Sequence, residues 1–169
     1  MSVQLAFQQM SAAIKTWPER KQWAAALRLA VPALVIIAAL GILSGWLIWA
    51  PVTDIPALLM TAALLFFVPV LVEELVFRGV FLSWLTQLTP RWGAWLSTLL
   101  FVAWHPLQAL AIGPPWAHIF LQPTFWVATL ILGIILAHIR IVSRSLWPVI
   151  LIHWFAVLIW KSLLGGPFY

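Results

Sequence analysis

The sequence predicts an all-α integral membrane protein, with about five transmembrane helices in a compact bundle and an N-terminal interfacial amphipathic helix. The 169 residues are 64 % hydrophobic and only 8 % charged, whereas a soluble domain carries roughly 25 % charged residues. Several apolar stretches also reach the roughly 20 residues that a helix needs to cross a bilayer. The length suits a single membrane domain.

Charge and cysteine content exclude several functional classes. The net charge of +5 comes from few Lys and Arg residues, which lie mostly between the apolar segments, where such residues orient membrane proteins. We therefore expect the lipid bilayer as a partner and no nucleic acid. The absence of cysteine excludes disulfides, thiolate metal sites and a cysteine nucleophile.

The N-terminal segment, residues 1–26, has a helical stripe of apolar residues with three- and four-residue spacing. The stripe consists of Val3, Phe7, Met10, Ile14 and Trp17, and basic residues follow it. This pattern indicates an amphipathic helix on the membrane surface. A loosely ordered basic leader explains the same composition, and the sequence leaves both interpretations open.

Five membrane spans follow the leader. We expect them at residues 27–50, 57–85, 93–112, 123–139 and 146–164. The chain thus divides into the leader (1–26), a first transmembrane helix with a turn (27–56) and a core (57–164). The second span is longer than a bilayer requires, so it should tilt or bend near Pro69. Residues 113–123 are predicted to form a loop or re-entrant segment.

Basic residues predict the orientation of the bundle. Lys and Arg precede the first span and follow the second and fourth, whereas the opposite loops contain Asp54 and no Lys or Arg. Because cytoplasmic loops are enriched in Lys and Arg, we expect the N-terminus in the cytoplasm. Lys161, near the other end, is the one dissenting charge.

Ionisable residues interrupt three of the spans. The stretch "FFVPVLVEELVFRGVF" (66–81) contains Glu73, Glu74 and Arg78, and two later spans contain His105 and His153. Counted from the predicted cytoplasmic loops, these residues lie about 12–20 Å along their helices. Such groups normally face a bundle interior or a water-filled cavity, so the similar depths predict one shared site.

Helical geometry separates the two glutamates. Glu74 and Arg78 are four residues apart on one face and can pair, whereas Glu73 is rotated by about 100°. We expect Arg78 to keep Glu74 ionised, while Glu73 is available to water and to His105. The pair is equally consistent with a structural salt bridge. The other three side chains suit a base, a proton carrier and an oxyanion donor.

The order of these residues resembles a known family. "EELVFR" (73–78) is similar to its Glu-Glu-x-x-x-Arg motif, "FVAWH" (101–105) to its Phe-x-x-x-His motif, and "SLWPVILIHWFAV" (145–157) to its third conserved block. The chain thus resembles the CPBP family, also called the Abi family, of CAAX proteases and bacteriocin-processing enzymes. The resemblance extends over about residues 57–160.

The resemblance implies a glutamic-type intramembrane endopeptidase. It assigns water activation to Glu73 and His105, with Glu74, Arg78 and His153 completing the site. Many relatives carry an oxyanion-stabilising Asn where this chain has Val157. Trp104, Trp154 and Ser97 are candidate substitutes. Two Glu and two His are also compatible with zinc, but there is no His-Glu-x-x-His helix and Arg78 disfavours a cation, so we expect no cofactor.

The expected substrate is a membrane-anchored or lipidated peptide or protein. In relatives, the reaction removes prenylated C-terminal tails, matures bacteriocins or pheromones, or cleaves C-terminal sorting tails. The expected location is the bacterial cytoplasmic membrane. A non-catalytic immunity or scaffold protein of the same fold is an alternative, and a proton-coupled transporter is a further one because buried Glu and His also form proton relays.

Overall fold

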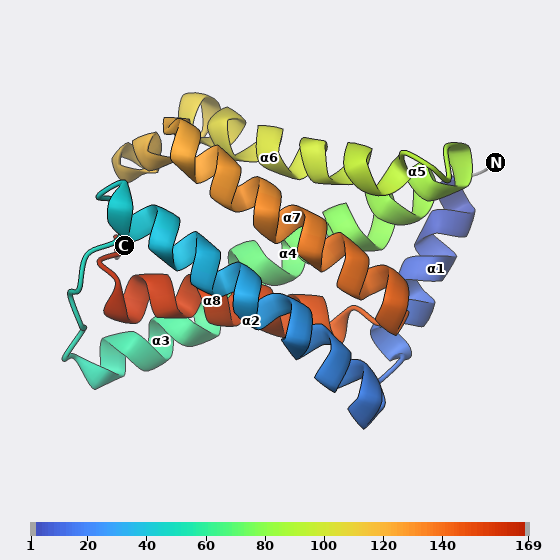
Figure 1. Ribbon diagram of the computed structural model, residues 1–169, viewed down its shortest axis with the longest axis horizontal. Coiled ribbons are helices and arrows are strands. Elements are labelled where there is room, and N and C mark those ends of the chain that lie inside the picture. Colours follow the sequence, from blue (N-terminus) through green and yellow to red (C-terminus); the bar gives the residue numbers. More distant parts are fainter. Residues whose placement is uncertain (1–2, 168–169) are drawn as a thin grey trace.

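The computed structural model describes residues 3–167, and these form a helical bundle (Figure 1). The elements are α1 (Val3–Lys15), α2 (Arg20–Leu43), α3 (Ile55–Leu65), η1 (Phe66–Leu71), α4 (Val72–Glu74), η2 (Leu75–Phe81), α5 (Leu82–Leu88), α6 (Gly93–Ala111), η3 (Pro115–Leu121), α7 (Pro123–Ser143) and α8 (Trp147–Leu163).

Four segments of the described chain are long and apolar enough to cross a membrane, and the shorter apolar α8 accompanies them. The four are α2, the composite segment Ile55–Leu88, α6 and α7. They follow the long direction of the molecule, and α7 packs against both α2 and α6 (Figure 1). Many of their large apolar side chains are exposed, as expected where lipid replaces water. This confirms the predicted helical membrane fold.

The first span was expected at residues 27–50, and this boundary is wrong. α2 begins at Arg20 and ends at Leu43. It begins early because the backbone N–H of Glu19 donates to Gln22 Oε1 at 2.7 Å, which satisfies a group exposed at the helix start. It ends early because Gly45 adopts a left-handed φ of 77°, a conformation that commonly terminates helices.

The chain after α2 returns along the end of α8 instead of continuing the span. The backbone N–H groups of Ile48, Ala50 and Val52 donate to the carbonyl oxygens of Leu164, Leu163 and Ser162, respectively. This extended stretch replaces the last turns of the predicted helix. It places Trp46 beside α8, where the indole contacts the Trp160 ring edge-on, with 6.3 Å between the ring centroids.

The long segment Ile55–Leu88 bends where expected. Val68 has an extended backbone (φ −135°, ψ 119°) immediately before Pro69, which interrupts the helix between α3 and the rest of the segment. α3 then packs on α8, whereas η2 and α5 lie against α6 and α1. The bend therefore turns α4, which carries Glu73 and Glu74, into the centre of the bundle (Figure 1).

The later elements follow the predicted order, with small differences in their bounds. The expected loop at 113–123 contains the 3₁₀ helix η3. α7 continues to Ser143, four residues beyond the expected end, and stops where Arg144 adopts a left-handed φ of 56°. The predicted spans at 93–112 and 146–164 agree with α6 and α8 to within one residue at each end.

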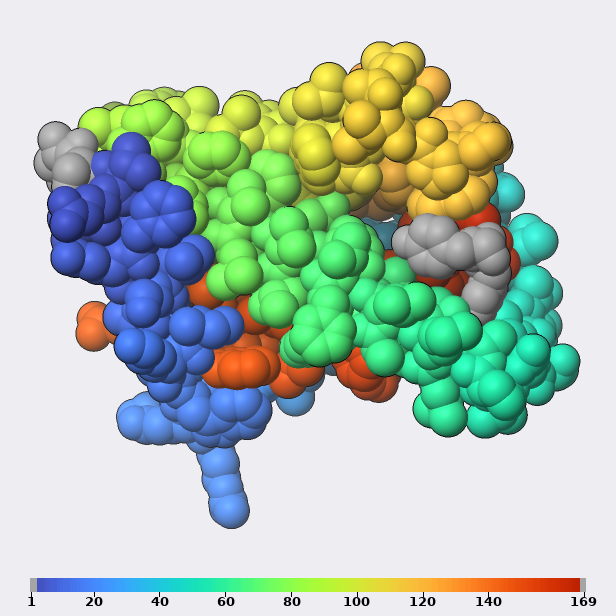
Figure 2. Space-filling model, turned by 180° about the vertical axis from the view of Figure 1, so that it is seen from behind, coloured from blue at the N-terminus to red at the C-terminus, as the bar shows by residue number. Residues whose placement is uncertain are grey.

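The N-terminal segment is a helix, which decides between the two interpretations of the leader for the described residues 3–15. α1 runs across one end of the bundle, roughly perpendicular to α6 (Figure 1), and it covers η2 and α5 (Figure 2). Three hydrogen bonds attach the segment to the start of α8. The donors are Ser145 Oγ, the Leu146 N–H and Trp147 Nε1, and the acceptors are the carbonyl oxygens of Thr16, Ala13 and Ile14, respectively.

Candidate active site

The five ionisable residues singled out in the sequence lie together in the centre of the bundle. Glu73 and Glu74 come from α4, Arg78 from η2, His105 from α6 and His153 from α8. All five are buried, with at most 7 % of each residue exposed. Three separate segments of the chain therefore supply one polar cluster inside an apolar bundle, as the similar depths predict.

Glu74 is the most deeply placed of the five, and two side-chain donors meet one of its oxygens, while Oε2 has no partner among residues 3–167. Its Oε1 atom lies 2.8 Å from Arg78 Nη1 and 2.7 Å from His153 Nδ1. The predicted pairing of Glu74 with Arg78 is thus present. The contact with His153 was not predicted, because residues 79 positions apart are brought together only by the packing of α8 against the bend in the long segment.

This contact orients the imidazole of His153. An ionised carboxylate only accepts hydrogen bonds, so the proton between Glu74 and His153 belongs to Nδ1 of the histidine. Nε2 then points away from Glu74 and lies 3.9 Å from Glu73 Oε2. Glu74 therefore positions the ring, and the opposite nitrogen is left facing the second glutamate.

Glu73 has a different environment from Glu74. Its Oε1 atom accepts hydrogen bonds from Trp104 Nε1 at 3.1 Å and Gln108 Nε2 at 3.3 Å. Its Oε2 atom accepts none within the described residues and faces His153. Gln108 was missed in the sequence, although it lies one helical turn after His105 and so shares its face of α6. The expected direct partner His105 makes no hydrogen bond with Glu73 here.

His105 is oriented by its own helix. Its Nδ1 atom lies 2.9 Å from the carbonyl oxygen of Phe101, and because a carbonyl only accepts, Nδ1 carries the proton. Nε2 remains for another partner. The Phe101 ring contacts both imidazoles, with centroid distances of 4.8 Å to His105 and 5.8 Å to His153, and its face lies 3.9 Å from the Arg78 guanidinium carbon.

A cavity of about 510 Å³ lies against this cluster. Glu73, His105, Gln108 and His153 line it, whereas Glu74 and Arg78 do not. Most of the remaining wall is apolar and comes from α2, η3, α7 and α8. Pockets that bind ligands commonly combine an apolar wall with a few convergent polar groups. The cavity therefore separates the cluster into an accessible part and a part buried behind it.

The cavity wall also contains Val157 and two indole donors. Val157 lies one turn of α8 beyond His153, so an apolar side chain occupies the position where the family resemblance implies Asn. The Nε1 atoms of Trp46 and Trp160 are buried and have no hydrogen-bond partner among residues 3–167. A buried N–H without a partner is costly, so each of these two indoles carries a donor that residues 3–167 leave unsatisfied.

The three candidate substitutes for the missing Asn already donate elsewhere. Ser97 Oγ donates to the Phe77 carbonyl at 2.7 Å, Trp154 Nε1 to the Ala62 carbonyl at 2.8 Å and Trp104 Nε1 to Glu73. Ser97 and Trp154 thus join helices to one another, while Trp104 holds the accessible glutamate. Their hydrogen bonds give them structural and positioning tasks in this conformation.

The donor set has limited capacity for a metal ion. Within the described part of the chain, no three His, Cys, Asp or Glu side chains are grouped so as to hold one. Oε1 of Glu74 is already shared between Arg78 and His153, and the adjacent guanidinium opposes a second cation. Glu73, His105 and His153 are therefore better suited to carry protons and to form hydrogen bonds.

Comparison with known proteins identifies the fold around this cluster. The family described as type II CAAX prenyl endopeptidase, Rce1-like, matches residues 55–159. No curated protein and no solved structure matches the chain. The matched region extends from the start of α3 into α8 and contains all five clustered residues, whereas α1 and α2 precede it. Because the match spans more than half of its length, the chain belongs to the Rce1-like CAAX endopeptidase family.

Proposed function

We propose that this protein is an intramembrane endopeptidase in which Glu73 activates water to hydrolyse a peptide bond. Membership of the family already indicates a protease. The observation that carries the mechanism is the asymmetry of the Glu73 carboxylate: Oε1 is held by two donors, and Oε2 faces His153 across 3.9 Å beside the cavity. A bridging water suits polar atoms separated by more than hydrogen-bonding distance.

In the proposed reaction, Glu73 Oε2 accepts a proton from this water while the water oxygen attacks the substrate carbonyl carbon. The carbonyl π electrons move to its oxygen, which becomes an oxyanion. Collapse of the tetrahedral intermediate breaks the C–N bond, and the proton held by Glu73 passes to the leaving amine. A positioned base of this kind contributes typically 10²–10⁴-fold to the rate.

The histidines are proposed to stabilise the oxyanion and relay protons. Their Nδ1 atoms are committed to Phe101 and Glu74, respectively, which directs both Nε2 atoms to reacting groups. His153 becomes a donor at Nε2 once it is protonated, and the adjacent Glu74 stabilises that imidazolium. Arg78 balances the charge of Glu74 in the absence of substrate. Glu74 and Arg78 thus act through His153 and do not touch the substrate.

The proposed substrate is a membrane-anchored or lipidated peptide or protein. The cavity wall is mostly apolar, which suits hydrophobic side chains or an acyl or prenyl group. Trp46 and Trp160 belong to this wall, and their Nε1 donors are left unsatisfied by residues 3–167. His153 and Trp160 are seven residues apart on α8, or about 10 Å, a span of about three extended residues. The proposed location is the bacterial cytoplasmic membrane, with α1 on the cytoplasmic side.

The test is hydrolysis by the purified full chain in lipid nanodiscs. A library of fluorogenic membrane peptides, with and without a lipidated cysteine, is compared for the wild type, Glu73→Gln and His105→Ala. The matched control is Gln87→Glu, a substitution of similar size at the far end of the bundle. Mass spectrometry of the products identifies the cleaved bond.

We expect cleavage by the wild type and the control, and loss of cleavage with Glu73→Gln. Cleavage that persists in Glu73→Gln would exclude the proposed base. Cleavage that a chelator abolishes and zinc restores would replace the proton-transfer mechanism by a metal-dependent one. Absence of cleavage in every arm, together with proton-coupled solute uptake into proteoliposomes, would favour the transporter instead.

A further inference from the structure

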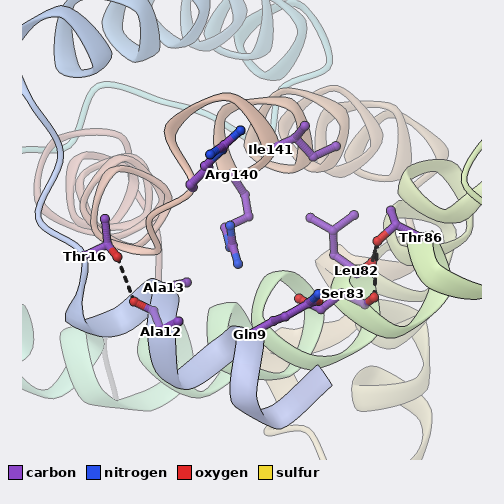
Figure 3. A pocket seen from close by; sticks show the side chains of 10 residues that line it. Gln9, Ala12, Ala13, Thr16, Leu82, Ser83, Thr86, Arg140 and Ile141 are labelled. Carbon is purple, nitrogen blue, oxygen red and sulfur yellow. Dashed lines mark hydrogen bonds between the residues drawn. The ribbon is translucent and has the colours of Figure 1, made fainter. Parts of the chain in front are cut away.

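A second pocket lies beside α1, apart from the cavity that Glu73 lines. It has a volume of about 430 Å³. Its walls come from α1, α5 and the C-terminal end of α7 (Figure 3). The lining residues are Gln9, Ala12, Ala13, Thr16, Leu82, Ser83, Thr86, Arg140, Ile141 and Arg144. None of these residues lines the cavity beside Glu73.

Two arginines, Arg140 and Arg144, line this pocket, and no counter-charge accompanies them. Neither Arg140 nor Arg144 forms an ion pair or donates a side-chain hydrogen bond within residues 3–167, and the buried Nε atom of Arg140 has no partner. No carboxylate belongs to the lining. Two uncompensated cations around a hollow favour an anion, and guanidinium groups match phosphate oxygens particularly well.

The hydroxyl and amide groups of the wall are partly committed. Thr16 Oγ1 donates to the Ala12 carbonyl, and Thr86 Oγ1 donates to the carbonyls of Leu82 and Ser83 (Figure 3). Gln9 Oε1 accepts from Gln87 Nε2 at 3.0 Å, which leaves the Gln9 amide group as a donor. The hydrogen-bond donors of the pocket are therefore the Gln9 amide, the two guanidinium groups and the Ser83 hydroxyl.

Aromatic rings and an exposed apolar side chain lie near the pocket. Residues of α1, α5 and the end of α7 line it, and α1 packs on η2 and α5 at one end of the bundle (Figure 1). At the same end, the Trp17 ring lies 5.7 Å from Trp23 and 5.5 Å from Trp147, and tryptophan is enriched at membrane–water interfaces. Ile141, which is 49 % exposed on α7, continues the wall towards the bilayer with an apolar surface.

We propose that this pocket binds one anionic phospholipid, with its phosphate between Arg140 and Arg144 and an acyl chain along Ile141. A zwitterionic headgroup fits less well, because its cation meets two guanidinium groups and no carboxylate. Inorganic phosphate has the charge but lacks the acyl chain. Because α1 forms one wall, the bound lipid joins α1 to the ends of α5 and α7. Lipid binding at this pocket does not require peptide hydrolysis.

The test is a titration of the full chain, purified in detergent, with phosphatidylglycerol, phosphatidylcholine or inorganic phosphate, followed by native mass spectrometry. The wild type is compared with Arg140→Gln/Arg144→Gln. The control Arg20→Gln/Arg91→Gln removes two exposed charges that do not line the pocket. Arg144→Asn keeps a residue that tolerates the left-handed backbone, so it separates loss of binding from loss of folding. Ala12→Leu fills the pocket and retains all charges.

We expect one tightly bound phosphatidylglycerol on the wild type and the control, with about tenfold weaker binding for each guanidinium removed. Arg144→Asn should lose affinity without losing thermal stability, and Ala12→Leu should also bind more weakly. Equal affinity for the double variant and its control would overturn the proposal. So would equal binding of phosphatidylcholine, or inorganic phosphate that binds as tightly as the lipid, which would indicate a soluble ligand.

Discussion

Glu73 and Glu74 are neighbours in the sequence, yet the bundle gives them opposite environments. Glu74 is fully buried and contacts Arg78 and His153, and it does not reach the cavity. Glu73 lines the cavity, and neutral donors hold only one of its oxygens. The rotation of about 100° between consecutive helical residues therefore separates a charge that organises the site from one that is accessible to a ligand.

The strongest test of this comparison is Glu73→Gln. The amide oxygen can still accept from Trp104 and Gln108, so folding should be little affected, but the side chain can no longer accept a proton from water. We expect kcat to fall by about 10³-fold, measured with the membrane peptide that the wild type cleaves. The midpoint of thermal unfolding in detergent provides the control. A matching fall in stability would show that Glu73 has the structural task assigned here to Glu74.

Glu74→Gln should show the opposite balance. It leaves Arg78 buried without its carboxylate, and breaking one side of a buried ion pair costs about 3–5 kcal/mol. We expect this loss in the free energy of unfolding, measured by denaturant titration in mixed micelles. The double variant Glu74→Leu/Arg78→Met should recover much of it, because no charge is stranded. Equal stability of Glu74→Gln and wild type would remove the distinction between the two glutamates.

Trp160→Phe tests the cavity side of the site, away from the proposed reacting groups. The change keeps the aromatic ring of a residue that lines the cavity but removes its Nε1–H, which has no partner among residues 3–167. The loss of one neutral hydrogen bond to the substrate corresponds to an increase in KM of up to about tenfold, with kcat nearly unchanged. Trp95→Phe, on the exposed surface of α6, is the matched control. A change confined to kcat would place Trp160 at the reaction centre instead.

Val157→Asn has the smallest expected effect. Val157 lies in the cavity wall one turn beyond His153, so an amide there adds a donor near the proposed oxyanion. We expect kcat to rise by about threefold, within the range of one neutral hydrogen bond. Val157→Thr is the control for polarity, since it is closer in shape to valine. A fall in kcat for Val157→Asn would show that the valine is needed for packing the substrate.

Much of this architecture could be anticipated because membrane helices leave strong signals in a sequence. The spans in α6 and α8, the bend at Pro69 and the pairing of Glu74 with Arg78 each follow from a local rule. The start of α2 was missed because it depends on the contact between Glu19 and Gln22, within a segment that also reads as a basic leader.

The finer geometry of the site depends on contacts between distant segments. The contact of His153 with Glu74 requires α8 to pack against the bent segment in one particular register. Gln108 can be recognised as a donor only when the position of Glu73 is known. Ser97 and Trp154 resemble free donors in the sequence because their carbonyl partners, in Phe77 and Ala62, are set by helix packing. Catalytic assignment of the five clustered residues remains a prediction for the variants above to test.

The attachment of α1 to the start of α8 has a consequence for biosynthesis. Residues 13–16 leave the ribosome early, but their hydrogen-bond partners, Ser145 to Trp147, are about 130 positions later in the chain. At 5–20 residues per second, translation needs roughly 7–26 s to reach them. α1 therefore cannot complete these contacts until nearly all spans have been synthesised, and its docking is among the last steps that complete the protein.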